Sequence, residues 1–106
     1  MFIMFNILIC VDNEGYIAPP HDCRRVLVID IDEQRVVDRV EVEPGQLPGL
    51  IEFLDEKYDL QVLHTREPLG DSTVLYDTGV YVHVVRDRKH FNNILDEIYG
   101  FTVDTI

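Results

Sequence analysis

The run from Phe5 to Val11 constrains the fold most strongly, because every residue in it except Asn6 is apolar. A strand with one wet face alternates polar and apolar residues, whereas a run with so little alternation is typical of a strand covered on both faces. Residues 12–15, Asp-Asn-Glu-Gly, then end the run with turn-forming side chains. We therefore expect a first strand that is covered on both faces.

Two further strands are expected directly afterwards, at residues 25–31 and 35–42. Only residues 32–34 separate them, and so short a link joins two strands in a hairpin. Polar positions recur in the run 35–42, which indicates a strand with one wet face or a strand at the edge of the sheet.

Helices and strands then alternate along the chain. Apolar residues share one helical face over residues 50–58, which predicts a helix, and the run 60–64 predicts a fourth strand parallel to a neighbour. Residues 71–77 could form a short helix with Asp71 as its cap. Residues 80–85 are expected to form a fifth strand.

The last element is expected to be a helix with Asp87 as its cap and Gly100 at its end. Its apolar stripe consists of Phe91, Ile94, Leu95 and Ile98. The resulting order, β-β-β-α-β-α-β-α, predicts an α/β fold with a mixed five-stranded sheet and helices on its faces. A chain of 106 residues has room for one such domain, spanning residues 1–106.

The charge of the chain limits its partners. Asp and Glu number 20 against 9 Lys and Arg, which gives a formal net charge of -11. So negative a surface repels phosphate backbones and anionic lipids, so neither nucleic acid nor a membrane is expected as a partner. Cations, metal clusters and basic proteins fit the charge, although acidity also serves solubility or reflects a salt-adapted host. The oligomeric state has no signature in the sequence.

The cysteines and the N-terminus bear on the compartment. Cys10 and Cys23 are fewer than small secreted domains use as staples, which favours a reduced, cytoplasmic setting. The apolar start, Met1 to Val11, lacks the basic residues and the cleavage site of a signal peptide. It is also far shorter than the ~20 apolar residues of a membrane helix.

The best candidates for chemistry are His21, Asp22 and Cys23, which lie in a loop introduced by Pro19-Pro20 before the second strand. Loops at strand ends are where α/β sheets commonly bind ligands. Imidazole and thiolate groups both suit iron or its clusters. His21 and Cys23 are therefore the expected metal ligands.

Other residues could add to this site. Cys10 could point to the same end of the sheet, or it could be an ordinary buried thiol. His64 precedes the loop 65–70 and could face the same cavity. His83 lies inside a predicted strand, where a histidine with satisfied hydrogen bonds is the expectation, and His90 is expected to be solvated. Four histidines without close ligand spacing make a weak metal signal.

The order of the elements and several short motifs resemble those of the dinitrogenase iron–molybdenum cofactor-binding family. That family has a first strand ending in Asp, a loop with the motif His-Phe-Gly-Arg-Ala, and then a strand close to Tyr-Leu-Ile-Val-Asp-Ile. The corresponding segments here are Ile7 to Asp12, His21 to Arg25, Val26 to Ile31, Leu60 to His64, Leu69 to Asp71 and Thr78 to Val82. The resemblance covers roughly residues 5–85.

The resemblance implies a three-layer α/β/α sandwich of the ribonuclease H-like type. It also implies a non-enzymatic domain that binds or carries an iron–sulfur or iron–molybdenum cluster or its precursor. His21 falls on the family's histidine, and Arg24 could pair with an anionic cofactor or, alternatively, with nearby carboxylates. Asp22 and Cys23 replace the Phe and Gly of the motif, which leaves a ligand-free protein-interaction domain of the same fold as the alternative.

A metal-dependent nuclease is a weaker alternative. The fold implied by the resemblance can carry strand-borne carboxylates that hold two divalent metals, and Asp12, Asp30 and Asp32 are the candidates. However, the chain has no clear basic groove for such a substrate. Asp12 also begins a turn in which its side chain has a structural role. We therefore expect a binding domain and no enzymatic activity.

Overall fold

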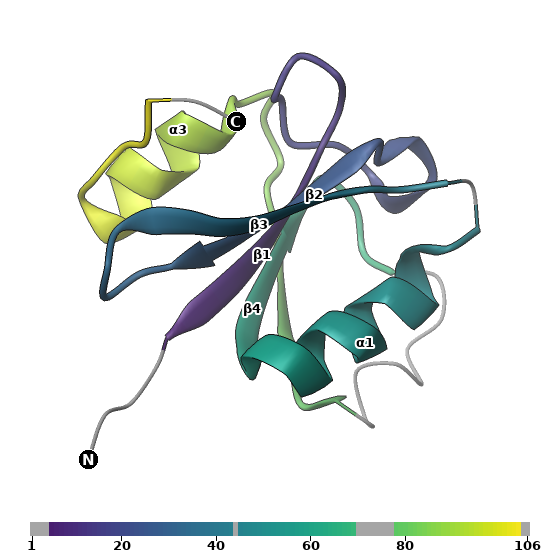
Figure 1. Cartoon of the computed structure of the whole chain (residues 1–106). Coiled ribbons are helices and arrows are strands. Elements are labelled where there is room, and N and C mark those ends of the chain that lie inside the picture. The colour runs from purple at the N-terminus through teal and green to yellow at the C-terminus, as the bar shows by residue number, and fades with distance from the viewer. Residues whose placement is uncertain (1–4, 44, 70–77, 105–106) are drawn as a thin grey trace.

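A computed structural model describes residues 5–43, 45–69 and 78–104. Its centre is a five-stranded sheet in the order β3-β2-β1-β4-β5 (Figure 1). The strands are β1 (Asn6–Val11), β2 (Arg25–Asp30), β3 (Arg35–Glu41), β4 (Leu60–Thr65) and β5 (Tyr81–Val84). β2 is antiparallel to both β1 and β3, whereas β4 is parallel to both β1 and β5. The predicted mixed five-stranded sheet, including its hairpin and its parallel fourth strand, is confirmed.

β1 is the middle strand, and all six of its residues are buried. Because side chains alternate along a strand, Leu8 and Cys10 face one hydrophobic cluster, and Ile7, Ile9 and Val11 face the other. β3, in contrast, lies at one edge and has only exposed or half-buried residues. Both predictions from the sequence patterns are therefore confirmed.

α1 (Leu47–Tyr58) covers one face of the sheet, where Leu47, Ile51 and Leu54 are buried. It begins at Leu47, whereas the sequence predicted a start at residue 50. The reason is that Pro48 lies in the first turn, where a missing N–H breaks no helical hydrogen bond. The helix ends at Tyr58, and the next residue, Asp59, caps it with a left-handed backbone of φ 56°.

The opposite face is covered by α3 (Phe91–Ile94), which continues into η2, one turn of π-helix (Leu95–Tyr99). α1 and α3 lie on opposite sides of the sheet, so the domain has three layers (Figure 1). Gly100, with φ 79°, ends this helix as predicted. The short helix predicted at residues 71–77 lies outside the described residues.

The start of α3 differs from the prediction, because its cap is His90 and not Asp87. The His90 Nδ1 atom accepts a hydrogen bond from the backbone N–H of Asn92 at 3.2 Å, and the Asn93 side chain accepts from the His90 N–H at 3.2 Å. His90 also packs edge-on against the Tyr16 ring, with 5.6 Å between ring centroids. The expectation that His90 is simply solvated is therefore wrong.

Close packing of Gly15 against His90 holds the turn after β1 on the start of α3. A Cβ atom added at Gly15, which has φ 89°, would lie 2.6 Å from the His90 Nε2 atom. The turn after β1 therefore contacts α3 through a position that suits only glycine. Among the described helices, none is both long and apolar enough to cross a membrane.

Candidate functional site

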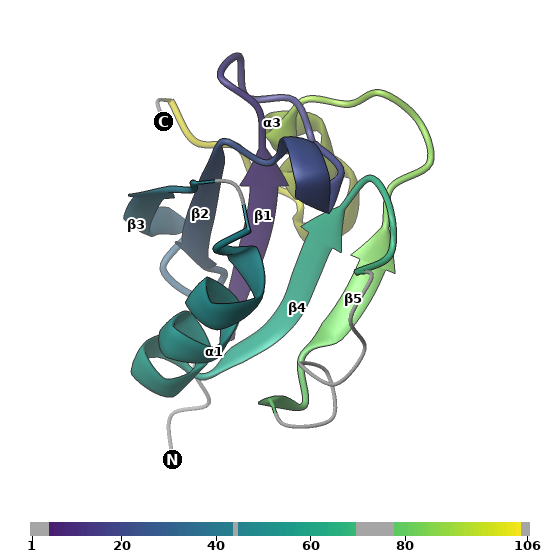
Figure 2. The same ribbon diagram turned by 90° about the vertical axis from the view of Figure 1, so that its right-hand side faces the viewer.

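The loops that follow β1 and β4 meet where these two strands end, because parallel strands have their carboxyl ends on the same side of the sheet. We call this carboxyl end of β1 and β4 the edge, as distinct from the edge strands β3 and β5. Figure 2 shows the arrowheads of β1 and β4 at this edge, with the short helix η1 (Pro20–Asp22) beside them. The Ala18 carbonyl accepts hydrogen bonds from the Arg66 N–H at 3.1 Å and the Thr65 hydroxyl at 3.0 Å. These bonds fix the first loop against the second.

His21 stands on this edge with its side chain 73% exposed. Pro19 and Pro20 lead the chain into η1, whose turn is closed by a hydrogen bond from the Asp22 N–H to the Pro19 carbonyl at 3.0 Å. The His21 Nδ1 atom lies 3.8 Å from the Glu67 Oε2 atom, and the Glu67 side chain is 59% exposed. The edge therefore offers one imidazole and one carboxylate to solvent.

Glu67 was not among the residues predicted for the site. The sequence placed it in a charged loop after a parallel strand, which was the one available signal that it could reach the His21 loop. The contact itself depends on how the Ala18 carbonyl joins the two loops, and the sequence does not show this.

Cys10 and Cys23 lie beneath the edge and point into the core. Cys10 has no exposed surface and Cys23 is 4% exposed, and both belong to the hydrophobic cluster under α1. Their thiols are hydrogen-bonded to each other, which raises the pKa of Cys10 and lowers the pKa of Cys23. Burial raises the pKa of Cys10 further. The Cys23 thiol also donates to the Arg25 carbonyl at 3.4 Å.

The structure thus separates the predicted ligands, since the imidazole of His21 faces solvent and both thiols face the core. Within residues 5–43, 45–69 and 78–104, no three His, Cys, Asp or Glu residues are grouped so as to hold a metal ion. The expected joint coordination of one metal by His21 and Cys23 is not assembled. The alternative of a buried core thiol describes Cys10.

Arg24 also lies at this edge, paired with a carboxylate. Its Nη2 atom is 3.5 Å from the Asp22 Oδ1 atom. Both residues line a shallow hollow of about 330 Å³, together with Asp12, Asn13, Glu14 and Arg88. The charge of Arg24 is therefore offset by neighbouring carboxylates, which is the alternative that the sequence left open.

His64 does not reach this edge site, contrary to expectation. It is buried on the opposite face of the sheet, where its Nδ1 atom lies 2.9 Å from the His83 Nδ1 atom and its Nε2 atom lies 2.8 Å from the Tyr99 hydroxyl. Alternation along β4 explains the error, because Leu63 faces α1 and the next residue must face α3. The expectation that His83 is a hydrogen-bonded strand histidine is confirmed.

Burial and charge set the protonation of this His–His–Tyr cluster. Burial, with a smaller contribution from His83, lowers the pKa of His64 to about 4. Burial also raises the pKa of Tyr99 to about 12. Near neutral pH, His64 is therefore an uncharged imidazole and Tyr99 an intact phenol. The sequence did not single out Tyr99, because its partner comes from a strand 35 residues away.

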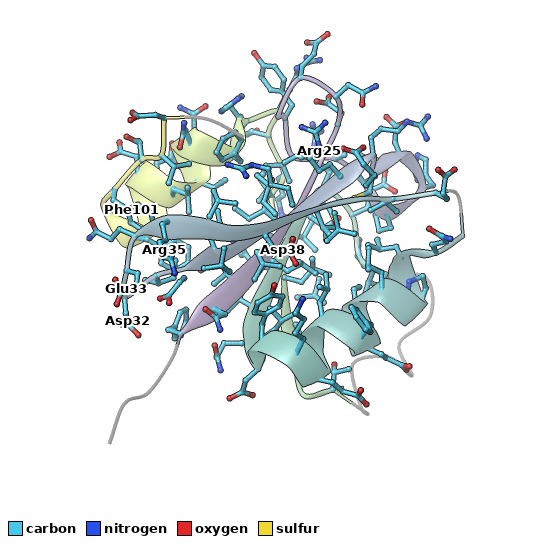
Figure 3. The ribbon with its side chains drawn as sticks, viewed as in Figure 1. Arg25, Asp32, Glu33, Arg35, Asp38 and Phe101 are labelled. Carbon is cyan, nitrogen blue, oxygen red and sulfur yellow. The ribbon has the colours of Figure 1, made fainter. Side chains whose placement is uncertain are left out.

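The carboxylates considered for nuclease chemistry lie at two opposite ends of β1. Asp12 uses its Oδ1 atom to accept hydrogen bonds from the N–H groups of Glu14 at 2.9 Å and Tyr16 at 3.0 Å. Asp30 pairs with the first residue of β1, at the opposite end of that strand. Asp32 lies in the hairpin turn, far from Arg25 at the other end of β2 (Figure 3). Asp12 is therefore not placed to share a pair of metal ions with Asp30 and Asp32.

No family model matches the chain, and no curated protein matches it in sequence. Among solved structures, it is similar to a presumed dinitrogenase from Methanocaldococcus jannaschii, whose crystal structure has a resolution of 1.70 Å. The TM-score is 0.59 at 17% sequence identity, and the match covers 94% of this chain and 92% of that chain. At so low an identity the likeness shows a shared fold, and it agrees with the α/β sandwich expected from the sequence.

Proposed function

We propose that this chain is a non-enzymatic binding domain that carries an iron–sulfur-based cluster, or a precursor of one, on the open edge formed by His21 and Glu67. The exposed imidazole of His21 carries the proposal, because it stands on a fixed turn at the strand ends with its ring in solvent. A presumed dinitrogenase shares the fold, and the resemblance of the sequence to the cofactor-binding family implies a cargo of this class.

The ligand set at the edge determines how the cluster is held. A closed shell of protein thiolates does not fit, because both cysteines are buried. A cluster that brings its own sulfides and other ligands needs only an outer bond from one imidazole, with Glu67 close by. Such a single attachment suits a cargo that is accepted and passed on.

The charged side chains around His21 also limit the charge of the cluster that the site can bind. Asp12, Glu14 and Asp22 outnumber the guanidinium groups of Arg24 and Arg88 around the adjoining hollow. Glu67 adds a fourth carboxylate beside His21. These groups repel anions, so the edge favours a cluster or precursor of low negative charge over an anionic iron–molybdenum cofactor.

Anaerobic titration with a synthetic iron–sulfur cluster, followed by visible absorption, tests this function. We expect His21→Ala to weaken binding by at least about tenfold, since even partners outside the ligand shell are worth that much in metal sites. Asn13→Ala removes an exposed side chain of the same edge and should bind as the parent does. Equal binding by the parent and His21→Ala, or no binding by either, would contradict the proposal.

A protein-interaction domain without a ligand is the second candidate, and two exposed apolar side chains favour it. Tyr81 on β5 is 67% exposed and Ile98 in η2 is 48% exposed. Purification without oxygen, followed by metal analysis, separates the two functions. A stoichiometric protein partner without iron would favour this second candidate, and iron that depends on His21 would favour the first.

A further inference from the structure

The side of α1 that faces away from the sheet carries an exposed stripe of side chains. Gly49, Glu52, Phe53 and Glu56 are all exposed, and their spacing of i, i+3, i+4 and i+7 places them on one helical face. We call these residues the outer stripe. Figure 1 shows α1 on the outside of the sheet, so this stripe is open to a partner.

Phe53 is the apolar centre of the outer stripe and is 60% exposed. Single exposed apolar side chains are common on monomers, so Phe53 alone indicates little. One helical turn earlier, however, a shallow hollow of about 410 Å³ is lined by Gly45, Gln46, Gly49 and Leu50. An aromatic ring beside a hollow offers both a contact surface and room for an apolar side chain of a partner.

Gly49 keeps this hollow open although its own surroundings do not require a glycine. A Cβ atom added at Gly49 would have no atom within 4 Å, and Gly49 is not one of the glycines with positive φ. Glycine in a helix is less favourable than alanine, so the open backbone costs helix stability. Where two helices pack, a small residue at the contact lets their axes approach closely.

Two carboxylates flank Phe53 without a countercharge. Glu52 and Glu56 lie one helical turn apart, and neither forms an ion pair with a residue that the structure describes. Like charges at i and i+4 repel each other and destabilise a helix. The neighbouring Lys57 does not relieve them, because its Nζ atom lies 4.0 Å from the Asp38 Oδ2 atom. The outer stripe therefore presents negative charge around an apolar centre.

We propose that the outer stripe is a docking surface for a basic amphipathic helix of a partner protein. The apolar face of that helix places one side chain in the hollow beside Phe53, and Lys or Arg residues one turn apart meet Glu52 and Glu56. A second copy of this chain does not fit, because a symmetric pair brings the same carboxylates together on chains that each carry a net charge of -11. The inference goes beyond the proposed function and does not depend on it, since it uses neither His21 nor Glu67.

Fluorescence polarisation with a synthetic peptide tests the docking surface. The probe is a fluorescein-labelled peptide of Leu, Ala and Lys whose Leu residues share one helical face, and its counterpart has Glu in place of every Lys. We expect the full chain to bind the basic peptide and not the acidic one. Phe53→Ala should weaken binding by about tenfold, because it truncates an aromatic side chain at the centre of the contact. Alanine is the better helix former, so this variant keeps α1.

Two charge-matched variants separate docking on the stripe from a general attraction to an acidic protein. Glu52→Gln/Glu56→Gln removes two carboxylates from the outer stripe, and Glu33→Gln/Asp96→Asn removes two exposed carboxylates from other elements. We expect the first variant to bind about fivefold more weakly in dilute salt and to depend less on salt concentration. The second variant should bind nearly as the parent does.

Gly49→Ala provides a readout in which stability and binding change in opposite directions. The added methyl group improves the helix and fills part of the hollow, so the midpoint of thermal unfolding should rise while binding of the basic peptide weakens. The proposal is overturned if the parent does not bind the basic peptide, if Phe53→Ala binds as tightly as the parent, or if the two charge variants lose the same affinity. A dimer of the chain that Phe53→Ala dissociates would also overturn it.

Discussion

The surroundings and partners of each side chain at the centre of this domain depend on the face of the sheet from which it projects. His64 shows this most clearly, because it lies one position after Leu63 and therefore faces α3 and not α1. Asp12 could be interpreted correctly from the sequence, since its turn partners lie within four residues. The partners of His64 come from β5 and η2, and no local pattern indicates them.

Burial of neutral His64 makes stability depend on pH. The unfolded chain binds a proton at the ordinary pKa of about 6.5, whereas the folded chain binds it only near a pKa of about 4. The stability from this group is therefore complete above pH 6.5, is lost as the pH falls from 6.5 to 4, and changes no further below that. The loss should be on the order of 3 kcal/mol.

Urea unfolding at pH 7.5 and at pH 4.5 measures this loss. Carboxylates also contribute in acid, so the comparison that matters is with His64→Gln, which cannot titrate at this position. We expect the parent to lose more stability than His64→Gln over the same interval, by about 2 kcal/mol or more. Equal losses in the two proteins would show that His64 is not held neutral by the fold.

At the scale of elements, strands and helices followed the apolar pattern closely, but their ends did not. The sequence predicted the helix over residues 50–58, yet α1 begins at Leu47 because Pro48 is tolerated in the first turn. It also assigned the last cap to Asp87, whereas the chain enters α3 at His90. That entry point is set by a bridge between Tyr16 and His90, a contact between distant segments.

Removal of the cap should destabilise the domain through α3. We expect His90→Ala to cost about 1 kcal/mol, because the N–H of Asn92 loses its acceptor and the packing on Tyr16 is lost as well. Urea unfolding near pH 7.5 measures the change. His21→Ala serves as the control, since it removes an imidazole that is 73% exposed and should alter stability by less than about 0.5 kcal/mol. Equal stabilities for the two variants would argue against the capping role.

At the scale of the whole molecule, the order of the elements fixed most of the architecture. A buried first strand, a hairpin and a crossover helix leave few ways to arrange one mixed sheet, and the observed order β3-β2-β1-β4-β5 is among them. The candidate site was predicted only in part. His21 was located correctly at the edge, but short spacing in the sequence also grouped it with Cys23, whose side chain points the opposite way.

The central claim is that one exposed imidazole makes the bond between this domain and its cargo. Pulsed electron paramagnetic resonance tests it most directly. The sample is an anaerobic complex between a reduced iron–sulfur cluster and protein whose histidines are labelled with the nitrogen-15 isotope. We predict a hyperfine coupling to one histidine nitrogen that disappears in His21→Ala and persists in His83→Ala. A coupling that survives in His21→Ala, or a bound cluster with no histidine coupling in the parent, would contradict the claim.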